Sequence, residues 1–199
     1  MLFHYHFWTP HLEETEEFYV QAGFQVHQRI GRYNGEFQSF DPPLTWNDFR
    51  DKSVLFRIIE LRKGSVNITF GYGKRPVFDH IGFLVSEEEK NGIIKRAGEL
   101  NWSHRSNERR TFIETPYGFK IELQTNVEYV KGGNSAIERL DLSVNQPGAE
   151  ESLSYLLNRH AGKMNISQTG NVQLNRAYIS ELDGLRKFDP NGLEIVSAK

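Results

Sequence analysis

The sequence predicts an α+β protein that is built from repeated βαβββ units. Segments rich in β-branched and aromatic residues alternate with segments of helical periodicity, and polar and apolar residues alternate within the strand-like segments. The order of strand, helix and further strands restarts at residue 78 and again at residue 136. Repetition at intervals of about 60 to 75 residues therefore organises the chain, which is 199 residues long.

Composition narrows the functions that such a fold could serve. The chain is 38% hydrophobic and 13% aromatic, which is enough for a core, and its formal net charge of -2 includes no block of like charges. We therefore expect a small-molecule partner, and neither nucleic acid nor a membrane surface. Without cysteine, any metal must be bound by histidine and carboxylate. No apolar run of about 18 residues and no cleavable leader occurs, so a cytoplasmic protein is expected.

The first unit is expected over residues 1–74. A strand over residues 2–8 meets Thr9 and Pro10, and an N-cap residue followed by proline predicts a helix that begins there and ends at Gly23. The β-branched and aromatic content then predicts further strands at 24–32, 54–62 and 66–73.

An irregular stretch over residues 41–51 interrupts the first unit. It contains two prolines and several large apolar residues. We predict a surface insertion here, although the apolar residues would also suit an ordered loop that covers a site.

The second unit begins with a strand over residues 78–85. Ser86 and Glu89 form a capping box, which predicts a helix that continues to Leu100. Strands at 111–115 and 119–124 complete the unit.

The third unit begins with a strand over residues 136–144. A helix after Pro147 and strands at 173–182 and 188–197 follow it. Two adjacent glycines mark residues 130–135 as the linker that precedes this unit. The predicted domains are a paired βαβββ domain over 1–127 and a third βαβββ-like module over 128–199.

Three polar residues stand out against the apolar alternation of their strands. They are His4, His80 and Glu122, and a period of two turns each of them away from the core face. Taken singly, a strand histidine is more often structural than a ligand. Together, two imidazoles and a carboxylate predict a divalent-metal site with open coordination positions.

Two segments carry a resemblance to a known family. The segment TPYGFKIEL at 115–123 and FDHIGFLV at 78–85 resemble the closing segment and a metal-bearing first strand of the vicinal oxygen chelate superfamily, which includes glyoxalase I, fosfomycin and bleomycin resistance proteins and the extradiol dioxygenases. The resemblance covers residues 1–127. It implies two modules that form a cup-shaped mixed sheet around one metal, with the third module as an additional copy.

The resemblance also implies a ligand set and a reaction type. His4 and His80 take the two histidine positions, Glu122 takes the final carboxylate, and Asn67 stands where glyoxalase-like members place a fourth, acidic ligand. Loss of that acid favours the three-ligand site that extradiol dioxygenases use for Fe(II), with Mn, Ni or Zn as other candidates. Phe112 replaces the tyrosine of the dioxygenase signature, and no histidine lies between His27 and His80 to act as the usual acid-base residue.

Further residues are candidates for roles around these ligands. His6 shares the face of His4, and His104 precedes the closing segment, so both are candidates to move a proton or orient a bound oxygen. The candidates for lining the substrate pocket are Tyr5, Trp8, Asn67 and Tyr72.

Three functions remain open from the sequence. A metal-dependent enzyme acting on a small substrate with adjacent oxygens is preferred, with dioxygenase chemistry slightly ahead of isomerase or lyase chemistry. A protein that sequesters a small molecule without turning it over is the alternative, and an assembly protein is the third reading. Because the third module has no partner, its sheet edge also predicts a homodimer.

Overall fold

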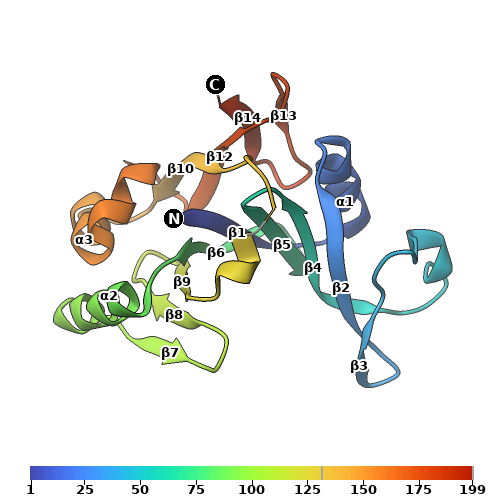
Figure 1. The fold of residues 1–199 in the computed structure, drawn as a ribbon, viewed down its shortest axis with the longest axis horizontal. Coiled ribbons are helices and arrows are strands. Elements are labelled where there is room, and N and C mark those ends of the chain that lie inside the picture. Colours follow the sequence, from blue (N-terminus) through green and yellow to red (C-terminus); the bar gives the residue numbers. More distant parts are fainter. Residues whose placement is uncertain (131, 199) are drawn as a thin grey trace.

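The computed structural model describes residues 1–130 and 132–198. Lys131, which falls in the predicted linker, lies outside the described residues. The described residues form two sheets with three α-helices at their margins (Figure 1). In chain order the elements are β1 (Leu2–Thr9), α1 (Leu12–Gln21), β2 (Gln25–Tyr33), β3 (Glu36–Ser39), η1 (Trp46–Asp48), β4 (Leu55–Lys63), β5 (Val66–Tyr72), β6 (Val77–Leu84), α2 (Glu87–Glu99), β7 (His104–Ser106), β8 (Thr111–Glu114), β9 (Lys120–Gln124), η2 (Val127–Val130), β10 (Ile137–Val144), α3 (Ala149–Leu157), η3 (Asn158–Lys163), β11 (Met164–Gln168), β12 (Gln173–Ser180), β13 (Arg186–Phe188) and β14 (Glu194–Ala198).

The two helix starts of the N-terminal modules differ in how well local sequence specified them. At α2, Ser86 caps the helix as predicted: its hydroxyl accepts from the Glu89 amide while the Glu89 carboxylate accepts from the Ser86 amide. At α1 the predicted start is wrong, because His11 rather than Thr9 is the N-cap residue. The Thr9 hydroxyl instead accepts from the His11 amide, so it holds the turn that precedes the helix.

A nine-stranded sheet contains both N-terminal modules. Its order is β3-β2-β4-β5-β1-β6-β9-β8-β7. In each module the first strand pairs in parallel with the last, as β1 with β5 and β6 with β9, and β1 and β6 pair antiparallel at the junction. The α+β class and the mixed sheet predicted from sequence are therefore confirmed.

The third unit forms a separate five-stranded sheet whose pairing differs from that of the N-terminal modules. Its order is β11-β10-β12-β14-β13. Here β10 pairs in parallel with β11 across α3, and β12 pairs in parallel with β14, so the parallel partner of the first strand is not the last strand. The single βαβββ copy predicted from sequence does not describe this order, because the strand that follows α3 pairs in parallel with β10.

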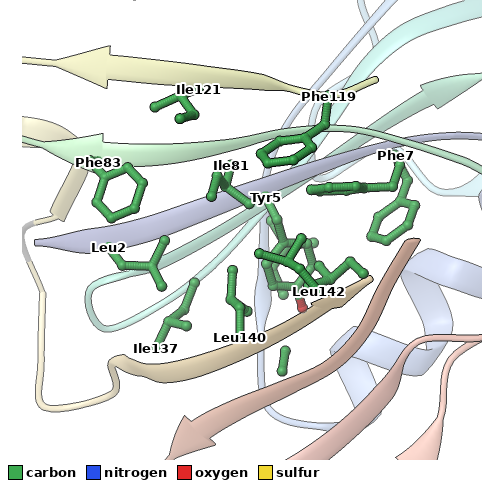
Figure 2. Packing of buried hydrophobic residues seen from close by; sticks show 14 of the residues in the cluster. Leu2, Tyr5, Phe7, Ile81, Phe83, Phe119, Ile121, Ile137, Leu140 and Leu142 are labelled. Atoms are coloured by element: carbon green, nitrogen blue, oxygen red, sulfur yellow. The ribbon is translucent and has the colours of Figure 1, made fainter. Parts of the chain in front are cut away.

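The two sheets pack against each other through their apolar faces. Figure 2 shows Ile137, Leu140 and Leu142 of β10 pointing toward side chains of the first sheet. Those side chains include Leu2, Tyr5, Ile81 and Phe83, all of them buried. Burial of apolar area at about 25 cal/mol per Å² is the main stabilising contribution of such a layer. The polar face of the first sheet consequently points away from the second sheet.

The segment between β3 and β4 is ordered by its own aromatic residues. Phe40 and Phe49 are buried and pack edge-to-face on each other and on Phe56 of β4. The Arg29 guanidinium is buried and forms an ion pair with Glu16. It donates to the carbonyl oxygens of Phe40 and Leu44. No residue between 40 and 54 lines the cavity on the polar face of the first sheet, so this insertion does not cover that cavity.

None of the helices within the described residues is long and apolar enough to cross a membrane.

Candidate metal centre

Strand register brings two histidines and one glutamate together on the polar face of the first sheet. His4 lies on β1, His80 on the neighbouring β6, and Glu122 on β9, where it pairs with Gly82. The Nε2 atoms of His4 and His80 are 3.0 Å apart, and Glu122 Oε2 lies 3.2 Å from His80 Nε2 and 3.8 Å from His4 Nε2. All three residues are buried. The convergence that the sequence predicted for them is therefore present.

Each histidine is held through its other ring nitrogen. His4 Nδ1 donates to the carbonyl oxygen of Asn67 at 3.0 Å, and His80 Nδ1 donates to Asp79 Oδ2 at 2.7 Å. These bonds fix the tautomer, so both neutral rings turn an Nε2 lone pair toward the other. Two facing lone pairs repel unless a proton or a cation lies between them. Histidines that bind metals usually donate their other ring N–H to a carbonyl oxygen or a carboxylate in this way.

The carboxylate ligand candidate has a partner as well. Arg110 Nη1 donates to Glu122 Oε2 at 3.1 Å and Oε1 at 3.3 Å. Asp79 accepts from Trp8 Nε1 at 3.0 Å and pairs with Lys120 Nζ at 2.8 Å, so the residue that orients His80 is itself fixed. The site is therefore held rigidly from three sides.

Burial and neighbouring charges set the pKa values of the three residues. Burial lowers the pKa of His4 to about 4, against the opposing effect of the Glu122 charge. Burial also acts to lower the pKa of His80, but its hydrogen bonds with Asp79 and Glu122 outweigh that effect, and the pKa is raised. For Glu122, burial acts to raise the pKa, and hydrogen bonding to His80 with the charges of His4 and Arg110 lowers it to about 2. In the absence of metal, these environments favour a state in which one proton is shared near His80.

The donor set and its spacing fit a divalent metal. In octahedral coordination with metal–ligand distances of about 2.1 Å, neighbouring ligand atoms lie about 3.0 Å apart. The three observed separations of 3.0, 3.2 and 3.8 Å need only small adjustments to reach this geometry. Two imidazoles and one carboxylate on one side of the ion leave the other side open to a ligand.

We expect metal binding to strengthen as the pH rises through the pKa of His80. A proton on His80 Nε2 competes with the metal, and because this pKa is raised in the metal-free protein, competition extends above the ordinary histidine range of about 6.5. Titration of metal-free protein with Zn²⁺ at about pH 6 and about pH 8 should give a lower dissociation constant at the higher pH. Equal constants at both values would contradict the assignment of His80 as a ligand.

The candidate metal centre opens into a cavity of about 800 Å³. Its walls come from both modules. From the first module, His6, Trp8 and Thr69 lie beside the centre and β2 and β4 supply a further wall, and the second module contributes Phe112 and Lys120. His6 stacks on His80 with ring centroids 4.9 Å apart and planes 8° apart, and its Nδ1 lies 2.6 Å from the Thr69 hydroxyl. The predicted site residues His6, Trp8 and Asn67 thus do line the cavity.

Three predicted site residues lie elsewhere. Tyr5 is buried in the core, where its hydroxyl hydrogen-bonds that of Tyr19, because strand alternation turns it opposite to His4 and His6. Tyr72 ends β5 with 46% of its surface exposed and does not line the cavity. His104 is exposed at the edge strand β7 and is also absent from the lining. Their strands place all three side chains away from the cavity.

The fourth-ligand position also needs correction, from Asn67 to Thr69. Glu122 lies two residues beyond Lys120, the parallel partner of His80, and Thr69 lies two residues beyond Asn67, the parallel partner of His4. Thr69 Oγ1 is 3.5 Å from His4 Nε2. The Asn67 side chain instead donates to Glu60 at 2.5 Å. The position of a fourth acid is therefore filled by an uncharged hydroxyl.

Sequence reasoning also missed Asp79 and Arg110. Asp79 directly precedes His80, and an acid beside a candidate ligand is a signal that could have been used. Arg110 comes from the turn between β7 and β8, where nothing local points to Glu122, 12 residues away. Only the folded hairpin brings that pair together.

Comparisons with known proteins bear on the fold. No protein-family model matches the sequence, and a search of curated proteins found no match. Among solved structures, the chain is similar to 2,2',3-trihydroxybiphenyl 1,2-dioxygenase from Sphingomonas wittichii, with a TM-score of 0.62, 11% identity, and coverage of 100% of this chain and 90% of that one.

Two further solved structures are similar to this chain. Homoprotocatechuate 2,3-dioxygenase from Arthrobacter globiformis has a TM-score of 0.65 at 12% identity, over 99% of this chain and 79% of that one. The enzyme of the same name from Brevibacterium fuscum, in complex with 3,4-dihydroxyphenylacetate, has a TM-score of 0.61 at 11% identity, over 100% and 80%. At these identities the likeness establishes the fold.

Proposed function

Because the chain has the fold of the vicinal oxygen chelate superfamily, we propose that it is a metal-dependent enzyme that acts on a small substrate with two adjacent oxygens. Ring-cleaving dioxygenase chemistry is favoured over isomerase or lyase chemistry. His4, His80 and Glu122 would hold the metal, with Fe(II) ahead of Mn, Ni or Zn.

The observation that carries this proposal is the pair of facing imidazoles. The Nε2 atoms of His4 and His80 lie 3.0 Å apart. Their lone pairs point at one position because each Nδ1 atom donates to a fixed acceptor. Burying two rings with facing lone pairs is energetically costly unless a cation or a proton lies between them. The nearby carboxylate supplies the negative charge that a divalent ion needs.

A bound metal of this type acts as a Lewis acid toward adjacent substrate oxygens and stabilises negative charge on them. The protein's own residues set the surroundings of that step. His6 lines the cavity beside His80 and would be the nearest imidazole outside the ligand set to a substrate oxygen bound there. Arg110 and Lys120 keep the Glu122 and Asp79 carboxylates in place, so the geometry exists before the substrate arrives.

Two features favour oxygenase chemistry. The uncharged Thr69 at the fourth position leaves three charged or imidazole ligands, which is the arrangement associated with Fe(II) oxygenases. The solved structures with the same fold are named as dioxygenases.

The proposal can be tested with metal-free protein reloaded under argon with Fe(II), Mn(II), Ni(II) or Zn(II). We expect one ion per chain by elemental analysis, and with Fe(II) or Mn(II) we expect oxygen uptake and a coloured ring-cleavage product from 3,4-dihydroxyphenylacetate, the ligand of the B. fuscum structure. Metal binding with neither oxygen uptake nor tight binding of any catechol would favour isomerase or lyase chemistry. Failure to bind any of the four ions would contradict the enzyme proposal.

A second candidate is a binding protein that sequesters its ligand without turnover. The Phe112 and His80 rings are nearly perpendicular with centroids 5.1 Å apart, so an apolar ring lies beside the candidate centre where the resembled dioxygenases have a tyrosine. Tight binding of a catechol with no product in the experiment above would favour this candidate. A homodimer stays a prediction from sequence, to be checked by light scattering at micromolar concentration.

A further inference from the structure

Five basic and four acidic side chains line the cavity. Three of the basic side chains have an acidic partner, in the pairs Arg62 with Glu60, Arg110 with Glu122, and Lys120 with Asp79. Within the described part of the chain, the other two, Arg57 and Arg109, make no ion pair. A divalent metal at the candidate centre would add further positive charge, so the cavity is suited to a ligand with negative charge.

Only one of the two unpaired guanidiniums is held in place. Arg57 lies over the indole ring of Trp8, with its guanidinium carbon 5.0 Å from the ring centroid. Such a cation–π contact keeps the charge at a defined place and leaves the hydrogen-bonding fork open at its edge. The side chain of Arg109 makes no comparable contact among the described residues.

The position of Trp8 is itself fixed. Its Nε1 donates to Asp79, and its ring occupies space that exists because residue 71 is glycine. A Cβ at Gly71 would lie 2.6 Å from Trp8 Cζ3 and 2.4 Å from the Arg57 carbonyl oxygen. The fixed Trp8 ring and the exposed Arg57 side chain over it therefore form a platform on the cavity wall.

The platform is connected to the candidate metal centre by a row of ring contacts. The Trp8 and His6 ring centroids are 4.6 Å apart, and the His6 ring stacks on His80. A ligand that reached from the metal to Arg57 would thus pass along the rings of His6 and Trp8. With about 800 Å³, the cavity is large enough for a ligand longer than one aromatic ring.

Two buried polar atoms lie in residues beside this row. His6 Nε2 and Asn67 Oδ1 have no hydrogen-bond partner within the described residues, and the two residues are 4% and 2% exposed. Buried polar atoms are rarely left unpaired, and both residues line the cavity. This part of the cavity wall therefore has unused hydrogen-bonding capacity.

From this arrangement we infer that Arg57 recognises a carboxylate on the substrate, and that the substrate class is an acid whose carboxylate lies remote from its two adjacent oxygens. One guanidinium matches one carboxylate in charge and in the spacing of its fork. The inference rests on the proposed function for the oxygen end of the substrate, whereas the carboxylate end depends on Arg57 and Trp8 alone.

The test compares three probes on metal-loaded protein under argon. They are 3,4-dihydroxyphenylacetate, the methylcatechol that remains when its carboxylate is removed, and phenylacetate, which lacks the two hydroxyls. Binding is measured by calorimetry for wild type, Arg57→Met and Arg75→Met. Methionine keeps an apolar chain over Trp8 and removes the charge, and Arg75 is an exposed residue outside the cavity, so its variant controls for net charge.

Wild type and Arg75→Met should bind the carboxylate catechol about 10-fold more tightly than methylcatechol, which corresponds to about 1.4 kcal/mol. In Arg57→Met this ratio should fall to about one, with binding of methylcatechol unchanged. A ratio of one in wild type, or an unchanged ratio in Arg57→Met, would overturn the inference.

Failure of the proposed function would be seen separately. If neither catechol binds to metal-loaded wild type, the adjacent-oxygen proposal is contradicted, and phenylacetate then decides on the carboxylate site. Weaker phenylacetate binding to Arg57→Met than to Arg75→Met would still support that site. Equal binding to both variants, or none to wild type, would overturn it.

Discussion

His80→Ala is expected to abolish stoichiometric metal binding while the protein remains folded. The substitution removes one of three ligand atoms, and the loss in affinity should exceed the roughly 10–100-fold cost of altering a residue that only supports a ligand. The fold should survive because the groups that contact His80 keep other partners. Asp79 retains Trp8 and Lys120, and Glu122 retains Arg110. Metal content by elemental analysis and a competition titration with a chelator measure the effect.

His104→Ala is the matched control for this experiment. It removes the same side chain from an exposed position on β7 that does not line the cavity. This variant should bind one metal ion per chain with the affinity of wild type. Equal metal content in the His80 and His104 variants would show that the three-residue group in the first sheet does not hold the ion.

Leu140→Ala should lower the free energy of unfolding by about 2–5 kcal/mol, the range for truncating a buried leucine. Leu140 is 0% exposed and lies between the two sheets, facing the layer that includes Leu2 and Tyr5 (Figure 2). The substitution removes apolar contact and leaves a cavity that the paired strands around it cannot close, since β10 is hydrogen-bonded on both sides. Urea denaturation followed by tryptophan fluorescence measures the change.

Leu55→Ala provides the comparison for the core variant. Leu55 is also a strand residue, but 43% of its surface is exposed, so its truncation should change stability by less than about 1 kcal/mol. If Leu140→Ala were as mild as Leu55→Ala, the packing of the second sheet on the first would contribute little to stability. If Leu140→Ala lowers stability but its native fraction still binds metal, the core contact contributes to stability and not to the candidate site.

Local patterns predicted the features that depend on residues close in sequence. The capping box at Ser86 is of this kind, because all its atoms belong to four consecutive residues. The inward and outward faces of β1, β6 and β9 are another, since alternation fixes them wherever one face is buried. The error at Thr9 shows the limit: a plausible N-cap followed by proline was displaced by a turn in which the same hydroxyl bonds the His11 amide.

Residues that act through long-range pairing could not be placed from such patterns. Asn67 and Thr69 share one strand face, and only the parallel register of β5 on β1 decides which of them matches Glu122. Arg110 reaches Glu122 across a hairpin, and Arg57 reaches Trp8 from a strand that is two places away in the sheet. A one-residue change in register would exchange the faces, and periodicity alone carries no information on register between strands.

The sequence by itself determined the α+β class and the three polar residues that face away from the core, because these follow from periodicity and residue type. Only the tertiary structure decided that their ligand atoms meet within bonding range of one ion, that Tyr5 and His104 lie elsewhere, and that the third unit forms its own sheet. Those outcomes depend on strand order and on the packing of two sheets, which are set by the summed contacts of distant residues and not by any one segment.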